Sequence, residues 1–192
     1  MKGGIPIEKR VVEASAVFGA VFFAAMGAVF LYPHFFIELM APELRQGAAL
    51  ADVLAGLSPG KAKLAELALI FLKNLSVAVI ALISGIGPAR GLPAAFICAL
   101  NGAVTGTAIT AFHAAGMPYL LLAGLLLPHG VVELPAIFLA CGMGYIMAKS
   151  KTPIKQRFKM GMRYVAPLLG AAAMIEVLVT PHVGMYVAKI VY

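Results

Sequence analysis

The chain has 192 residues, of which 62% are hydrophobic and 12% are charged, with a mean hydropathy of +0.97. Soluble domains are about 45–50% apolar and about 25% charged, and one globule of this size cannot bury so much apolar surface. The net charge of +7 is concentrated in a short segment between two apolar runs. Together these features exclude an ordinary soluble enzyme, argue against nucleic acid as a partner, and indicate an integral membrane protein.

Five apolar segments are long enough to cross a bilayer core of about 30 Å as helices. The runs are continuously apolar and lack a period of two, which favours helix over strand. The sequence therefore predicts an all-α, polytopic bundle in a single membrane domain over residues 1–192. The predicted spans are about 11–32, 64–86, 92–112, 117–148 and 160–180.

The connection over residues 33–63 is too long for a simple turn, and it mixes apolar with charged residues. Two structures are compatible with this mixture. One is a short amphipathic helix that lies in the membrane interface, and the other is a compact cap over the bundle.

The fourth apolar segment is longer than one bilayer crossing requires, and it contains Pro128, Gly130 and Pro135. Proline removes a backbone donor, and glycine permits unusual backbone dihedrals. We therefore expect a helix that is broken or strongly kinked near Pro128–Gly130, or a re-entrant half-helix followed by a full span.

Basic residues predict the orientation in the membrane, because cytoplasmic connections carry an excess of Lys and Arg. Lys2, Lys9 and Arg10 precede the first span, and Arg90 lies between the second and third. We expect a cell-membrane protein with a cytoplasmic N-terminus and an external C-terminus. A cytoplasmic anchor that contacts lipid headgroups would then be formed by Lys149, Lys151, Lys155, Arg157, Lys159 and Arg163.

Polar side chains inside the spans are candidates for function, since an ionisable group costs about 2.5–3.5 kcal/mol to insert at mid-helix. By their distance from the ends of the spans, we expect them in one layer, from the middle to the outer half of the membrane. Lys73 would pair there with Glu133 or Glu176. The layer comprises Lys73, Asn74, Asn101, His129, Glu133 and Glu176.

This layer is open to three interpretations. Structural hydrogen bonding between helices is one, and a proton or solute path is another. Metal binding is the third, because His129 and Glu133 are four residues apart and would share a helix face, with Glu176 or His182 as a further ligand. The zinc-protease pattern HExxH is absent, and Lys73, an Asn or freed backbone donors would satisfy Glu133 more simply. We therefore expect no metal, no cofactor and no catalytic residue.

Small side chains recur in the spans. Gly102 and Gly106 form a GxxxG pattern, which lets helix backbones approach closely. We expect it to pack helices within one bundle rather than to form a dimer seam. Cys98 and Cys141 stand alone in apolar runs, without metal or redox spacing, and are expected to be small core or lipid-facing side chains.

Residues 127–136 read L-P-H-G-V-V-E-L-P-A and resemble the signature of the stage II sporulation protein M family. Three further pieces agree in order: residues 71–75, where Lys73 stands in place of the family's Asn, the pair Asn101-Gly102, and residues 173–181. Together they cover most of residues 64–181. The resemblance implies a five-helix membrane domain, and the residues that match its motifs are Asn74, Asn101, Pro128, His129, Gly130, Glu133, Pro135, Glu176 and Pro181.

In spore-forming bacteria, the named member of that family is part of a membrane complex with peptidoglycan-degrading partners, where its role resembles that of a scaffold. The resemblance therefore favours a membrane scaffold or assembly factor over an enzyme. Its expected partners are the lipid bilayer and other membrane or envelope proteins, and a homo-oligomer stays open. A small transporter or channel-like protein is the alternative, and an intramembrane metal-dependent hydrolase is the third hypothesis.

Overall fold

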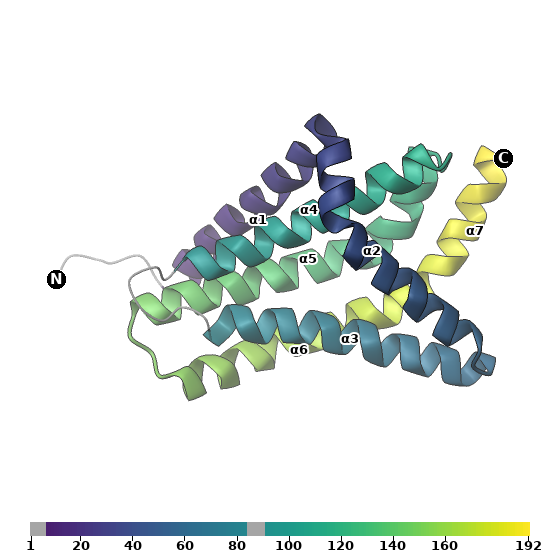
Figure 1. Ribbon diagram of the computed structural model, residues 1–192. Helices are drawn as coiled ribbons and strands as arrows, with labels where there is room; N and C mark the ends of the chain where they lie inside the picture. The colour runs from purple at the N-terminus through teal and green to yellow at the C-terminus, as the bar shows by residue number, and fades with distance from the viewer. Residues whose placement is uncertain (1–6, 84–90) are drawn as a thin grey trace.

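The computed structural model describes residues 7–83 and 91–192, and all regular structure in these two stretches is helical. The predicted all-α class is confirmed. In chain order (Figure 1), the helices are α1 (Ile7–Leu31), α2 (Pro33–Ala55), α3 (Pro59–Ile83), α4 (Leu92–Ala114), α5 (Tyr119–Lys149), α6 (Ile154–Leu178) and α7 (Thr180–Val191).

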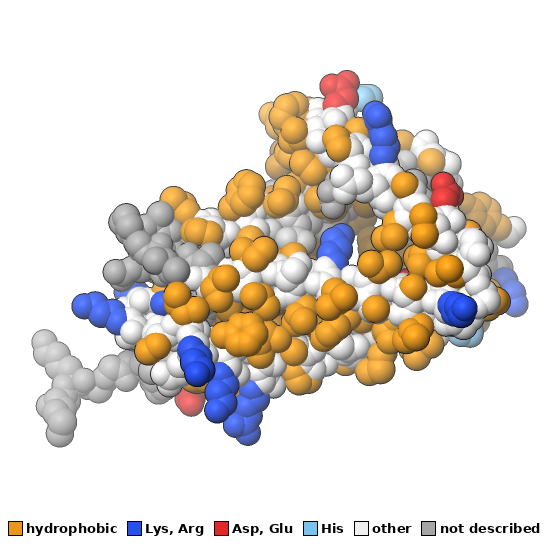
Figure 2. Space-filling view, turned by 60° about the horizontal axis from the view of Figure 1, so that its bottom comes forward, with side chains coloured by type: hydrophobic (Ala, Val, Ile, Leu, Met, Phe, Trp, Pro, Cys, Tyr) orange, Lys and Arg blue, Asp and Glu red, His pale blue; other side chains and the backbone are white. Residues whose placement is uncertain are grey.

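Five of these helices, α1, α3, α4, α5 and α6, are long and apolar enough to cross a membrane. They match the five predicted spans, although residues 84–86 of the second predicted span lie outside the described residues. Their outer surfaces carry large apolar side chains such as Leu31, Phe96 and Val131, which are 75%, 67% and 64% exposed. Figure 2 shows apolar side chains over much of one face. Apolar surface on this scale is stable only against lipid or another protein.

Helix α5 is the centre of the bundle. It contacts α1, α3, α4, α6 and α7, whereas α1 packs mainly against α4 and α5. The core lies between these helices and is built largely from small side chains, which allow close helix packing in lipid. Its fully enclosed members include Phe22, Ala81, Leu82, Ala140 and Leu169.

Glycines mark the closest approaches between helices. A Cβ on Gly102 of α4 would collide with the backbone of Phe22 on α1, and one on Gly106 would lie 2.9 Å from the Met26 carbonyl oxygen. On α5, Gly142 and Gly144 lie in the same way against the backbones of α1 and α3. The GxxxG pattern therefore packs α4 against α1 within the chain, as predicted.

Cys98 of α4 and Cys141 of α5 meet in the core, with their Sγ atoms 3.5 Å apart and both side chains fully buried. Both are core rather than lipid-facing side chains. Their proximity was not visible in the sequence, because 43 residues separate them.

The connection that was expected as a short interfacial helix or a compact cap contains the helix α2, and its last residues already belong to α3. Helix α2 has 23 residues, starts with a proline in its first turn and runs diagonally across the bundle (Figure 1). It packs against α4 and more weakly against α3 and α1. It is longer than the short helix that we expected.

The fourth segment was expected to be broken, strongly kinked or re-entrant near Pro128–Gly130. The break and the re-entrant half-helix are wrong, and a bent, continuous helix is the alternative that agrees with the structure (Figure 1). Helix α5 continues for 31 residues through Pro128 and Pro135, and Figure 1 shows its axis bending rather than ending. Proline costs the helix one hydrogen bond and a steric clash, but neighbouring helices can hold such a segment helical in a membrane. Five other helices pack against α5 in this way.

The chain turns at the end of the fifth span and continues as α7, a helix of 12 residues that the sequence analysis did not anticipate. It packs against α5 and, to a smaller extent, against α6. Pro181 lies in its first turn, where the missing proline N–H does no harm.

Candidate functional site

A cluster of three metal-ligating side chains lies between α5 and α6. His129 and Glu133 come from α5 and Glu176 from α6, and one potential ligand atom of each lies within 4.8 Å of the other two. All three side chains are partly buried. The structure thus brings together three residues that the sequence separates by up to 47 positions.

Simple helix geometry explains the convergence. His129 and Glu133 are four residues apart on the continuous α5 helix, so their side chains lie on one face. Helix α6 packs against α5, and Glu176 lies near its end at Leu178. The fifth span therefore packs against the fourth where Glu176 can serve as a third ligand.

Helix α3 adds Lys73 and Asn74 to the surroundings of the cluster. Asn74 is buried and lies beside the Glu133 carboxylate. Lys73 is largely exposed and acts on Glu133 and Glu176 through its charge alone. It attracts both carboxylates without the direct pairing that we expected from the sequence.

Thr180, at the start of α7, was not singled out as a site residue by the sequence analysis. It is 6% exposed, and its Oγ1 lies 3.4 Å from Nδ1 of His129. Thr180 is the first residue of α7 and Pro181 the second, and α7 packs against α5. The Thr180-Pro181 pair at the end of the family motif could have pointed to this residue. Its contact with His129, however, depends on the turn into α7, which the sequence analysis did not predict.

Asn101 does not join this cluster. Its side-chain amide donates to the Ile97 carbonyl oxygen of its own helix at 2.8 Å. Thr105, Thr107 and Thr110 of α4 likewise donate to carbonyl oxygens four residues earlier. Polar side chains of α4 are thus satisfied locally, which removes the need for a partner on another helix.

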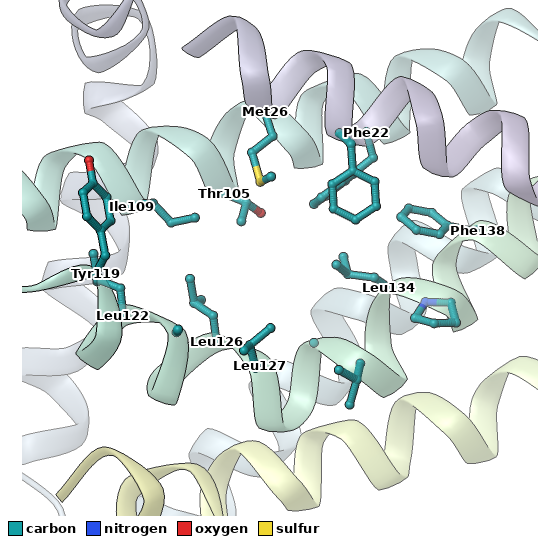
Figure 3. Close-up of a pocket in the computed structure, with 15 residues that line it drawn as sticks. Phe22, Met26, Thr105, Ile109, Tyr119, Leu122, Leu126, Leu127, Leu134 and Phe138 are labelled. Atoms are coloured by element: carbon teal, nitrogen blue, oxygen red, sulfur yellow. The ribbon is translucent and has the colours of Figure 1, made fainter. Parts of the chain in front are cut away.

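An apolar pocket of about 600 Å³ opens between α1, α4 and α5 (Figure 3). Gly130 and Pro135 of the family motif line it, but Pro128 does not. His129 and Glu133 do not line it, and at about 100° of rotation per residue the lining residues Val131 and Leu134 lie about 100° or more from either of them around α5. The pocket and the polar cluster therefore lie on different faces of α5. Other lining residues include Phe22, Met26, Thr105, Ile109, Tyr119, Leu126 and Phe138.

The basic cluster surrounds the connection between α5 and α6, at one end of the molecule (Figure 2). Lys149, Lys151, Lys155, Lys159 and Arg163 are exposed, as an anchor on lipid headgroups requires. Arg157 is different, because it is only 7% exposed and its Nε donates to the Thr152 carbonyl oxygen at 2.7 Å. Arg157 therefore fixes the turn and does not contribute to the exposed anchor.

Comparison with known proteins gives one family. The model of the family described as stage II sporulation protein M matches residues 14–181. No curated protein and no solved structure matches the chain.

Proposed function

Because the chain belongs to the stage II sporulation protein M family, we propose that it is an integral membrane scaffold or assembly factor. A buried polar layer joins its helices. The observation that carries the proposal is the convergence of His129, Glu133 and Glu176 within 4.8 Å, with Asn74 beside Glu133. These side chains come from three spans, α3, α5 and α6.

Polar contacts of this kind add to the van der Waals packing that associates helices in lipid. Lipid tails are as apolar as leucine, so helices gain little from burying apolar surface against each other. An interhelical hydrogen bond contributes about 0.5–2 kcal/mol, and an ionisable group without a partner is costly. The layer would therefore hold α3, α5 and α6 in one arrangement.

A scaffold role also suits the way in which the described residues are divided between membrane helices and connections. The described residues form membrane-spanning helices, two further helices and short turns, and they contain no separate extramembrane domain. Action on another molecule would thus occur within the membrane or at its surface. We propose the bilayer and other membrane or envelope proteins as partners, with the N-terminus cytoplasmic and the C-terminus outside.

The test is native electrophoresis of membranes from the source cell, solubilised in a mild detergent. Wild type and Glu133→Gln are expected in a complex larger than the chain, and Glu133→Ala is expected to lose that complex. Glu38→Ala, a change of an exposed carboxylate on α2, is the matched control. Migration of the wild type as a single chain would contradict the scaffold role. So would proton leakage into proteoliposomes that Glu133→Gln abolishes, because a conducting path depends on the charge.

A further inference from the structure

We propose that His129, Glu133 and Glu176 bind one divalent transition-metal cation, preferentially zinc, between α5 and α6. The sequence placed only two ligands on one segment and left the third open between Glu176 and His182, and simpler partners for Glu133 favoured a metal-free site. The structure supplies the third from a second helix, with all three ligand atoms within 4.8 Å of one another.

The spacing suits a metal with little adjustment. Ligand atoms about 2.0–2.2 Å from a tetrahedral zinc are about 3.3–3.6 Å apart. The observed limit of 4.8 Å exceeds this spacing by little more than an ångström. Rotation of the Glu133 and Glu176 side chains, which have three rotatable bonds each, can close such a gap without moving the helices.

The charges also match. As metal ligands, two ionised carboxylates and a neutral imidazole would carry a charge of −2, and the two carboxylates would repel each other in a site of low dielectric. A divalent cation would neutralise both, whereas the Lys73 ammonium carries one charge and is largely exposed. A ligand set with an imidazole selects zinc or a similar transition metal over magnesium and calcium, which prefer oxygen ligands alone.

The surroundings resemble the outer shell of a metal site. Metal-binding histidines usually hold their second ring nitrogen by a hydrogen bond, which fixes the tautomer and the ring orientation. Nδ1 of His129 lies 3.4 Å from the Thr180 hydroxyl. A bond from Nδ1–H to that hydroxyl leaves the lone pair on Nε2 for a metal. The amide side chain of Asn74, from α3, lies beside Glu133.

The metal site goes beyond the scaffold role and is independent of it. A bundle joined by hydrogen bonds alone would assemble its complex without metal. Loss of metal binding and loss of the complex are therefore separate results.

The experiment is a titration of Zn²⁺ into detergent-solubilised protein that carries no histidine tag and has been stripped with chelator. Elemental analysis after gel filtration gives the stoichiometry. We expect one zinc per chain, and at least a tenfold weaker affinity in His129→Ala, Glu133→Gln and Glu176→Gln. Visible absorption of the Co²⁺-loaded protein should show ligand-field bands that His129→Ala removes.

His182→Ala and Glu38→Gln are the matched controls, because His182 and Glu38 are exposed side chains outside the cluster. Both should bind zinc as the wild type does. Wild type without stoichiometric zinc would overturn the proposal, and so would binding that the three cluster variants leave unchanged. If His129→Ala fails to elute as a folded species, the near-isosteric variants Glu133→Gln and Glu176→Gln decide the question.

Discussion

The imidazole of His129 on α5 lies 3.4 Å from the hydroxyl of Thr180 on α7. This pair links the centre of the bundle to the C-terminal helix, and it lies at the edge of the polar cluster formed with Glu133 and Glu176. Since Thr180 is buried, neither partner can exchange this contact freely for water.

Thr180→Val should therefore destabilise the protein by about 1 kcal/mol. Valine has nearly the same volume as threonine but lacks the hydroxyl that contacts the His129 ring. Thr180→Ser should stay close to wild type. Thermal unfolding in detergent measures both. Thr110→Val is the control, since Thr110 bonds only within α4. Equal stability of the Val and Ser variants at position 180 would show that the contact contributes nothing.

Gly102→Ala should destabilise the bundle by roughly 1–3 kcal/mol, in the range of overpacking changes, because the new Cβ meets the backbone of Phe22. Gly27→Ala should be neutral or stabilising by up to about 1 kcal/mol. Its Cβ meets nothing within 4 Å, and alanine favours helix. Chemical unfolding of both variants in mixed micelles gives the comparison. If the Gly102→Ala variant were as stable as Gly27→Ala, α1 and α4 would have to be farther apart than the contact of Gly102 with Phe22 implies.

Cys98 and Cys141 should cross-link when purified protein is treated with copper phenanthroline, since their sulfur atoms are 3.5 Å apart. The two thiols give one electron to each of two Cu(II) ions, release two protons to the solvent and form one disulfide. Mass spectrometry of the digest should recover the linked peptides. Before oxidation, the fully buried thiols should react with maleimide only after unfolding. Rapid maleimide labelling of the native protein would contradict the packing of α4 on α5.

The orientation of the chain is a prediction from its basic residues. Single cysteines placed at Lys155 and Tyr192, in a chain whose two native cysteines are replaced by alanine, should be labelled from opposite sides of the membrane. Lys155 should be cytoplasmic and Tyr192 external, since five spans separate the two termini. Lys61 and Lys63 at the start of α3 oppose this orientation, so the labelling result is informative. Labelling of both positions from one side would contradict it.

Length and hydropathy were sufficient to predict the spans, because five long apolar runs leave a chain few other solutions in lipid. Local rules failed where tertiary contacts decide. Pro128 and Gly130 favour a break in an isolated helix, but α5 lies inside the bundle and stays continuous. Helix α7 was missed because Pro181 was interpreted as the end of the last span rather than the first turn of another helix.

The candidate site was predictable only in part. The cost of polar groups in lipid singled out His129, Glu133 and Glu176, and helix spacing placed the first two on one face. Asn101 passed the same test, yet it is satisfied by Ile97 within its own helix, a choice of rotamer that composition does not reveal. Arg157 could not be told from its exposed basic neighbours in the sequence, because its burial depends on the fold of the turn between α5 and α6.

The central claim is that polar contacts across α3, α5 and α6 hold the bundle together, and Glu133 tests it most directly. Glu133→Gln keeps the shape and hydrogen-bonding capacity of the side chain, whereas Glu133→Ala removes both. The measurement is the free energy of unfolding of the two variants, in mixed micelles without added metal. The account predicts that Glu133→Ala is less stable than Glu133→Gln by about 1–2 kcal/mol. Equal stability of the two variants and the wild type would contradict it.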